Sequence, residues 1–203
     1  MENLDFIAED IESQLDEKDA VREIALKSSR NIVRLCGKAI RQMHNQGDPD
    51  EAAQEALEEL QRLIGVTRDF PDIRHSGIVE SAMQEFVELK VLLAYSSGAA
   101  IPGYKELNVT PEAYLLGVGD VIGEIRRFAL DNIRRGSMDK AAQYLEHMED
   151  LYDFLMIFNY PNGLVAVRRK QDIARGVLEK TRGDVTMALR SHSLEKMLDN
   201  KEK

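Results

Sequence analysis

Apolar residues recur every three or four positions along most of the chain, which is the spacing of one face of an α-helix. The pattern is interrupted where Gly and Pro cluster, as in NQGDPDE and YPNG, so the chain divides into separate helices. The pattern therefore predicts an all-α fold, a bundle of six or seven helices. The expected helices are one that begins near residue 4 and is strongest over 21–44, then 50–64, 72–96, 111–135, 138–158, a segment from the YPNG turn to about 180, and 184–198.

No repeat, low-complexity tract or long flexible linker divides these helices. We therefore expect a single domain over residues 1–203, with an acidic amino-terminal segment over 1–20 and a frayed tail over 199–203. The clearest helix start is Thr110-Pro111, because threonine caps a helix and proline suits its first position.

The composition agrees with a helical protein of the reducing interior of a cell. The chain has only 5 Pro and 13 Gly, and its 43% hydrophobic content is enough for a core. Its one cysteine, Cys36, excludes an intramolecular disulfide and is expected to be a packing residue. The acidic start MENLDFIAEDIE does not resemble a secretory signal, and no apolar stretch is long enough to span a membrane. We expect a cytoplasmic protein with no membrane partner.

The net charge of −9 argues against nucleic-acid binding, but the charge is unevenly distributed. Residues 1–20 hold eight acids and one base, whereas residues 22–41 hold six bases and one acid. Five of these bases are spaced to line one face of a helix, and they form the basic stripe: Lys27, Arg30, Arg34, Lys38 and Arg41. The stripe could follow a phosphate backbone, or it could be a solvated face paired with the acidic segment. The later basic run Arg168-Arg169-Lys170 is expected to be a solvated patch or a subunit contact.

Four acids lie in segments that otherwise have the composition of a core. Glu85 and Glu88 belong to MQEFVEL, and Asp120 and Glu124 belong to LLGVGDVIGEI. Residues three or four apart share a helix face, and a buried carboxylate must be paired, protonated or bound to a cation. Two such pairs on facing helices would form a divalent-metal site. Alternatively, Glu124 pairs with Arg127 and the glutamates of the first pair face solvent.

The donor atoms narrow the choice of metal. Ligation by oxygen alone favours Mg²⁺ or Mn²⁺, and the lack of matching cysteine or histidine argues against zinc. No histidine follows a glutamate by three positions, which excludes a di-iron carboxylate bundle. Gly117, Gly119 and Gly123 beside the second pair would let a neighbouring helix or a ligand approach closely.

Long runs of this chain resemble the translin family, and the likeness covers most of the sequence after about residue 20. It is closer to the translin-associated factor X (Trax) branch, in which two similar motifs supply metal-binding acids. The resemblance implies that Glu85, Glu88, Asp120 and Glu124 are catalytic metal ligands. The runs are FPDIRHSGIVESAMQEFVELK, TPEAYLLGVGDVIGEIRR, LDNIRRGSMDKAAQYLEHMEDLYDFLMIFNYPNGL, RRKQD and TRGDVTMALR.

The resemblance implies a seven-helix fold, a hollow oligomer usually of eight subunits, and Mg²⁺-dependent endonuclease activity on single-stranded RNA within its cavity. Single-stranded DNA is a second candidate ligand, and the oligomer is expected to be a homo-oligomer unless a second translin-like chain takes part. RNA contact is expected along the basic stripe and at Arg74 and His75, which occupy a position similar to a basic element of the family. Two alternatives remain: a non-catalytic RNA- or DNA-binding oligomer with structural acids, and a helical interaction protein without metal or nucleic acid.

Overall fold

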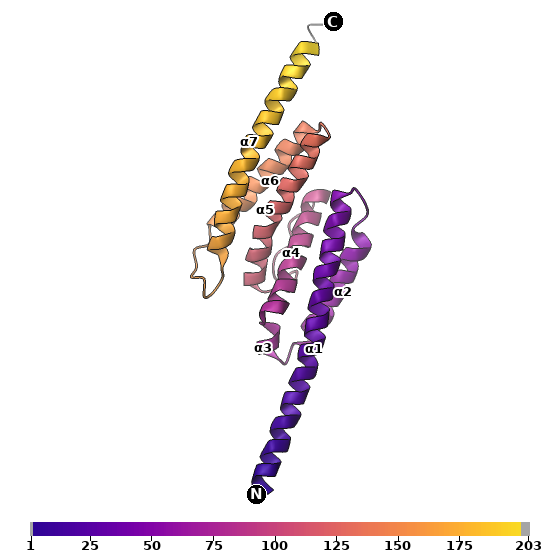
Figure 1. Cartoon of the computed structure of the whole chain (residues 1–203), viewed down its shortest axis with the longest axis vertical. Helices are drawn as coiled ribbons and strands as arrows, with labels where there is room; N and C mark the ends of the chain where they lie inside the picture. Colours follow the sequence, from indigo (N-terminus) through magenta and orange to yellow (C-terminus); the bar gives the residue numbers. More distant parts are fainter. Residues whose placement is uncertain (1, 200–203) are drawn as a thin grey trace. The chain divides into compact units, whose positions relative to one another are not determined.

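The computed structural model describes residues 2–199, which form seven helices and no strand (Figure 1). The helices are α1 Glu2–His44, α2 Asp50–Val66, α3 Pro71–Arg74, α4 Gly77–Ser97, α5 Pro111–Arg134, α6 Met138–Met156 and α7 Val167–Asp199. The all-α fold of six or seven helices that the apolar periodicity predicts is confirmed. Of the frayed tail expected over 199–203, Asp199 is the last residue of α7, and residues 200–203 lie outside the described residues.

The chain forms two compact units, Met1–Leu89 and Lys90–Lys203. The first contains α1, α2, α3 and the first part of α4, and the second contains the rest of α4 with α5, α6 and α7. Helix α4 is continuous across the boundary. The expectation of a single domain over 1–203 concerns how the units combine, and it stays a prediction.

The core of the first unit forms where α1 packs along α2. Ile32 and Leu35 of α1 and Leu60 and Leu63 of α2 are almost fully buried. Residues 3–20 of α1 lie beyond this packed region, and each of them is exposed (Figure 1). An ion pair between Lys18 and Asp72 links α1 to α3.

In the second unit, α5, α6 and α7 pack against one another. Ile122 and Ile125 of α5 and Met148 of α6 supply fully buried side chains. Arg126 joins α5 to α7, because its guanidinium donates to Thr181 Oγ1 at 2.8 Å and to Asp184 Oδ2 at 2.9 Å. These contacts set the positions of residues along α5 relative to α7.

The start of α5 is as predicted. Thr110 has an extended backbone, and its hydroxyl accepts a hydrogen bond from the Ala113 amide at 3.1 Å. Pro111 is the first helical residue. The cap satisfies an amide that the helix itself leaves without a partner.

Two predicted helix boundaries are wrong. The expected break between 180 and 184 is absent because α7 continues through Gly183, where buried Thr181 and Val185 on either side anchor it to the unit. The segment 72–96 is two helices, since the Ser76 carbonyl accepts from the Val79 and Glu80 amides and begins α4 separately. None of the described helices combines the length and the apolar character that crossing a membrane requires.

Candidate metal centre and nucleic-acid interface

The first acidic pair lies on the part of α4 that belongs to the first unit. Glu88 is only 8% exposed and Glu85 is half-buried, while Phe86 and Val87 between them are fully buried. The expectation that these glutamates face solvent is therefore wrong for Glu88. A carboxylate in such apolar surroundings needs a proton, a hydrogen-bond donor or a cation.

The thiol of Cys36 on α1 lies near the two carboxylates of this pair. Burial raises the pKa of the Cys36 thiol, and the nearby Glu85 and Glu88 carboxylates raise that pKa further. The thiol is fully buried, so Cys36 is the packing residue that its sequence context predicts. Both carboxylates of the first pair therefore lie near enough to the Cys36 thiol to act on its pKa.

The second acidic pair lies on α5, in the second unit. Asp120 and Glu124 are half-buried and stand on either side of the buried residues Val121 and Ile122. Glu124 Oε2 lies 3.9 Å from Arg127 Nη1, so the alternative pairing expected from the sequence is present at the outer limit of an ion pair. That pair is partly exposed, and such pairs contribute little stability.

Lys170 of α7 is the residue that sequence reasoning missed. Its ammonium forms an ion pair with Asp120 Oδ1, and its side chain is only 21% exposed. Of the two expectations for Arg168-Arg169-Lys170, the solvated patch does not hold for Lys170, and the subunit contact stays a prediction. The two partners are fifty residues apart in the sequence, so no local pattern could have paired them.

Gly119 makes this ion pair possible. A Cβ added at Gly119 would lie 2.9 Å from Lys170 Cβ, a distance that real Cβ contacts essentially never show, and 3.0 Å from Lys170 Cγ. The close approach predicted for the glycines beside Asp120 is thus confirmed at Gly119. At Gly123 an added Cβ would meet open space among the described residues.

The four carboxylates fit a hard cation by their chemistry, because all of their donor atoms are oxygen. Each pair shares one helix face, but the pairs belong to different units, so their convergence stays a prediction. Within residues 2–199 no three or more His, Cys, Asp or Glu side chains are grouped as a metal site. Asp120 already has a cationic partner in the Lys170 ammonium, which shows that its position favours positive charge.

The basic stripe lies on the part of α1 that packs along α2, and all of its members except half-buried Lys38 are exposed. Lys38 Nζ lies 4.0 Å from Glu51 of α2, and Arg34 donates to Asn31 Oδ1 at 2.7 Å. Because α1 is one continuous helix, its acidic segment extends along the helix axis and cannot fold back over the stripe of the same chain. Pairing between the stripe and the acidic segment within one chain is therefore excluded.

A shallow cavity beside the stripe extends the basic surface onto α2. It has a volume of about 460 Å³, and Lys27 and Asn31 of α1 line it together with Glu59 and Arg62 of α2. Arg62 was not singled out in the sequence, since it lies outside the stripe. Its guanidinium is 3.7 Å from Glu59, at a side-chain exposure of 63%, so it remains accessible to a phosphate.

Arg74 and His75 have structural contacts near the start of α4. Arg74 Nη1 donates to the Ile64 carbonyl at 3.3 Å, and His75 Nδ1 lies 3.4 Å from Glu80 Oε1. These contacts hold α3 against the end of α2 and beside α4. The expected RNA contact at both residues stays a prediction.

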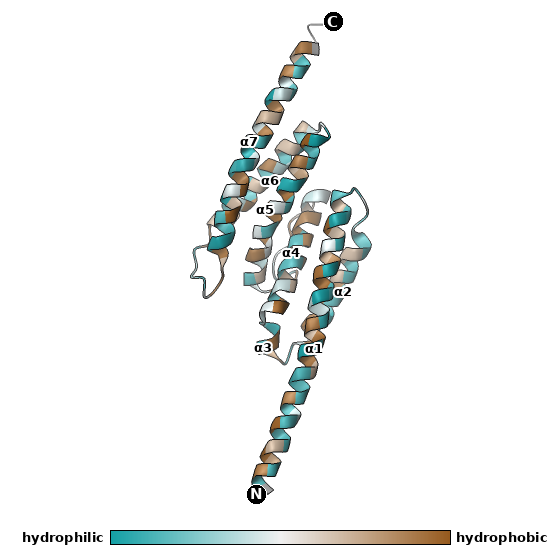
Figure 2. Ribbon diagram, viewed as in Figure 1, coloured by the Kyte–Doolittle hydropathy of each residue, from teal (hydrophilic) through white to brown (hydrophobic). Residues whose placement is uncertain are grey.

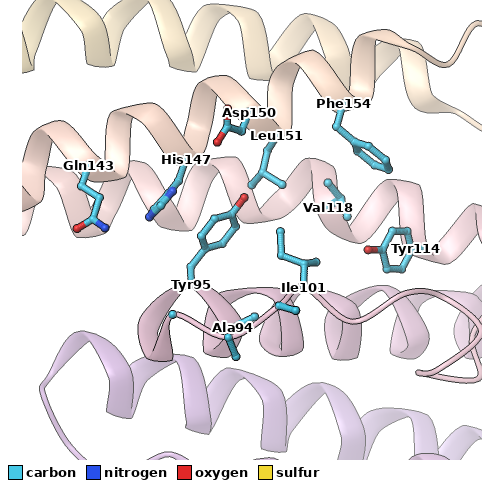
Figure 3. Close-up of a pocket in the computed structure, with 13 residues that line it drawn as sticks. Ala94, Tyr95, Ile101, Tyr114, Val118, Gln143, His147, Asp150, Leu151 and Phe154 are labelled. Atoms are coloured by element: carbon cyan, nitrogen blue, oxygen red, sulfur yellow. The ribbon is translucent and has the colours of Figure 1, made fainter.

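The largest described cavity of the second unit is unsuited to phosphate. It has a volume of about 640 Å³, and Tyr95, Tyr114 and Phe154 bring aromatic rings to it while Asp150 brings a carboxylate (Figure 3). Among the described residues that line it, none is lysine or arginine. Burial lowers the pKa of His147, whose ring lies 4.4 Å from that of Tyr95, so the histidine is neutral near pH 7.

The fold and the site define an all-α protein with paired carboxylates on apolar helices and a separate basic helix face. A sequence model of the translin family matches residues 18–182. The chain is 40% identical over 185 residues to the uncharacterized protein MJ0175 of Methanocaldococcus jannaschii, covering 89% of this chain and 82% of that protein. This chain belongs to the translin family.

Solved structures share the fold. AfC3PO, both alone and in a complex with duplex RNA, matches with a TM-score of 0.84 and 33% identity, over 91% of this chain and 97% of that one. Apo-NeC3PO matches with a TM-score of 0.73 and 24% identity, over 93% of this chain and 98% of that one. The match to apo-NeC3PO shows a shared fold alone.

Proposed function

We propose that this protein is a Mg²⁺- or Mn²⁺-dependent endoribonuclease that resembles the Trax branch of its family. The observation that carries the proposal is the presence of acids at all four positions of the two motifs, each with at least one buried residue directly beside it in its helix. A structural role alone does not require four carboxylates in such surroundings. Shared binding of a divalent cation offsets both their burial and their mutual repulsion.

Glu85 and Glu88 would hold the cation from α4, and Asp120 and Glu124 would hold it from α5. When bound, the cation supplies Lewis acidity toward water and toward the phosphodiester. The carboxylates position it and, by excluding other donors, select a hard metal over zinc. No side-chain nucleophile is needed, and the buried protonated thiol of Cys36 is unsuited to that role.

The basic stripe and Arg62 would hold the RNA backbone, joined by Arg74 and His75 near the start of α4. The stripe carries no aromatic residue, so it would contact phosphates and give weak sequence preference. The complex of the related AfC3PO with duplex RNA supports RNA as the ligand. We propose single-stranded RNA as the substrate, since a flexible strand reaches an enclosed site more readily than a stiff duplex.

We further propose that the protein acts as a homo-oligomer, with eight subunits as in its family, whose cavity encloses the site. The described ends of α1 and α7 support self-association, because both carry large exposed apolar side chains. A cytoplasmic location is part of this proposal.

The test is cleavage of end-labelled RNA by the purified protein. Single-stranded and duplex RNA of one sequence are compared in Mg²⁺, in Mn²⁺ and in a chelator, with Asp120→Asn and Glu124→Gln as variants. We expect metal-dependent cleavage of the single strand, and a loss of about a hundredfold or more in each variant, because each removes a ligand charge. Undiminished cleavage by both variants would overturn the metal-site assignment.

A non-catalytic RNA-binding oligomer is the second candidate. It is favoured by the ion pair between Asp120 and Lys170, which gives one of the four acids a structural partner. Salt-sensitive RNA binding without cleavage in either metal would select this candidate. If the protein shows no salt-sensitive RNA binding at all, the remaining candidate is a helical interaction protein without metal or nucleic acid.

A further inference from the structure

We propose that Lys170 is the built-in counter-ion of Asp120 and competes with the divalent cation, so that it sets the metal affinity of the site. The inference rests on the proposed function, because it concerns the same acidic cluster. Its starting observation is independent of any metal: the Lys170 ammonium forms an ion pair with Asp120 Oδ1 within the second unit.

The position of Lys170 is fixed by its own helix. The next residue, Gln171, is buried and donates from Nε2 to the Leu155 carbonyl at 2.7 Å and to the Phe158 carbonyl at 2.8 Å. Val167, one turn earlier, is fully buried. The first turns of α7 are thus held against the end of α6. The backbone position from which the Lys170 side chain extends is therefore fixed.

The path of the stem is fixed by α5. Lys170 Cβ, Cγ and Cδ all pass over Gly119, where an added Cβ would lie 2.9 to 3.2 Å from them. Gly119 directly precedes Asp120, so the backbone that carries the carboxylate also leaves the space for the lysine. A lysine on a solvated surface would not need such a space. The arrangement directs the ammonium toward Asp120.

The charges then oppose metal binding. The ammonium neutralises Asp120 while no metal is bound, which limits the repulsion among the acids. A divalent cation at the same carboxylate would lie within a few ångströms of the ammonium, where like charges in a partly buried site repel strongly. The ammonium must therefore move away from Asp120 when the cation binds. This displacement lowers metal affinity, and Lys170 acts as a positioning residue for the carboxylate.

The test is Mn²⁺ affinity by calorimetry and by electron paramagnetic resonance, without RNA. Lys170→Met keeps the length of the stem and removes the charge, whereas Lys170→Arg keeps the charge. Arg169→Met is the matched control, since it removes one positive charge from the neighbouring exposed position. We expect Lys170→Met to bind Mn²⁺ about tenfold more tightly, which corresponds to about 1.4 kcal/mol, and to unfold at a lower temperature than wild type without metal. Lys170→Arg and Arg169→Met should stay within about twofold of wild type.

The outcomes separate the two proposals. Tight Mn²⁺ binding by wild type that Asp120→Asn abolishes, with unchanged or weaker binding by Lys170→Met, would overturn the role of Lys170 and leave the metal site intact. An equal gain in Mn²⁺ affinity in Arg169→Met would mean that the gain comes from the lower net charge of the protein. That result would also overturn the role of Lys170. Absence of Mn²⁺ binding by every folded variant, with folding checked by circular dichroism, would overturn both proposals.

Discussion

Gly119 and Gly123 lie one helical turn apart on α5 and have different surroundings. Alanine at Gly123 would meet open space and gain the helix propensity that glycine lacks, about 1 kcal/mol. Alanine at Gly119 would collide with the Lys170 stem, and overpacking of this kind costs about 1–3 kcal/mol. We predict that Gly123→Ala raises the free energy of unfolding and that Gly119→Ala lowers it. Urea unfolding of the two matched variants checks this, and an equal gain in both would contradict the close contact.

His147 makes the stability of the second unit depend on pH. Burial lowers its pKa in the folded protein, although Asp150 and Glu146 partly oppose the shift, and its pKa in the unfolded chain is about 6.5. The unfolded chain therefore takes up the proton more readily. The neutral His147 side chain contributes its full stabilisation at pH values above its pKa in the unfolded chain. That stabilisation is lost as the pH falls through this pKa toward the lower pKa of His147 in the folded protein.

We predict that the free energy of unfolding decreases as pH falls from about 7.5 to about 5.5, and that His147→Phe makes this decrease smaller. Urea titrations at several pH values measure both slopes. His192→Phe is a control, because that histidine lies near the exposed end of α7. The account of His147 fails if His147→Phe and wild type lose stability in parallel.

At the scale of single residues, the sequence identified the four acids but not the partner of Asp120. The acids were visible because charge is unusual in an apolar helical pattern. Lys170 lies in a run of three bases, and which of the three turns inward depends on the packing of α7 against α5. Contacts between residues far apart in the chain leave no periodic signal.

Among the helices, α1 carries the prediction on RNA binding. Arg30 lies within the basic stripe, and Arg22 is an exposed arginine of the same helix outside the stripe, where it pairs with Asp19 and Glu23. We predict that Arg30→Ala weakens RNA binding several-fold at fixed salt and lowers the salt slope by about 0.7, the value for one phosphate contact to a single strand. Arg22→Ala should have little effect. Equal losses in both variants would mean that overall charge, rather than the stripe, binds RNA.

Helix ends were predictable where the local chemistry is decisive. The cap at Thr110 and the first-position Pro111 acted as expected, because both act within a few residues. The continuity of α7 through Gly183 was not predictable, since contacts from Arg126 of α5 to Thr181 and Asp184 span that glycine. Tertiary packing overrides a weak local preference.

For the whole molecule, the exposed apolar side chains at the described ends of the chain predict self-association. They recur along α1 and α7 at helical spacing, as the brown segments of Figure 2 show, and they are Leu4, Ile7, Ile11 and Leu15 at one end and Met187, Leu194, Met197 and Leu198 at the other. Apolar surface of this extent is stabilised when a partner covers it.

We predict that Ile11→Asp with Leu15→Asp reduces the oligomer to smaller species, because charge at these positions opposes burial. Light scattering after size-exclusion chromatography measures the mass. Glu9→Ala with Glu12→Ala on the same segment is the control. Unchanged mass in the aspartate variant would exclude the α1 segment from the subunit interface.

The proposed function requires that the acidic pairs of α4 and α5 hold their divalent metal jointly, as one shared centre. Its most direct test is Mn²⁺ binding by three folded proteins: wild type, Glu85→Gln with Glu88→Gln, and Asp120→Asn with Glu124→Gln. If all four carboxylates share the metal centre, either double variant alone loses affinity by about a hundredfold or more. If either double variant binds Mn²⁺ as tightly as wild type, the two pairs do not form a shared metal centre, and the account is contradicted.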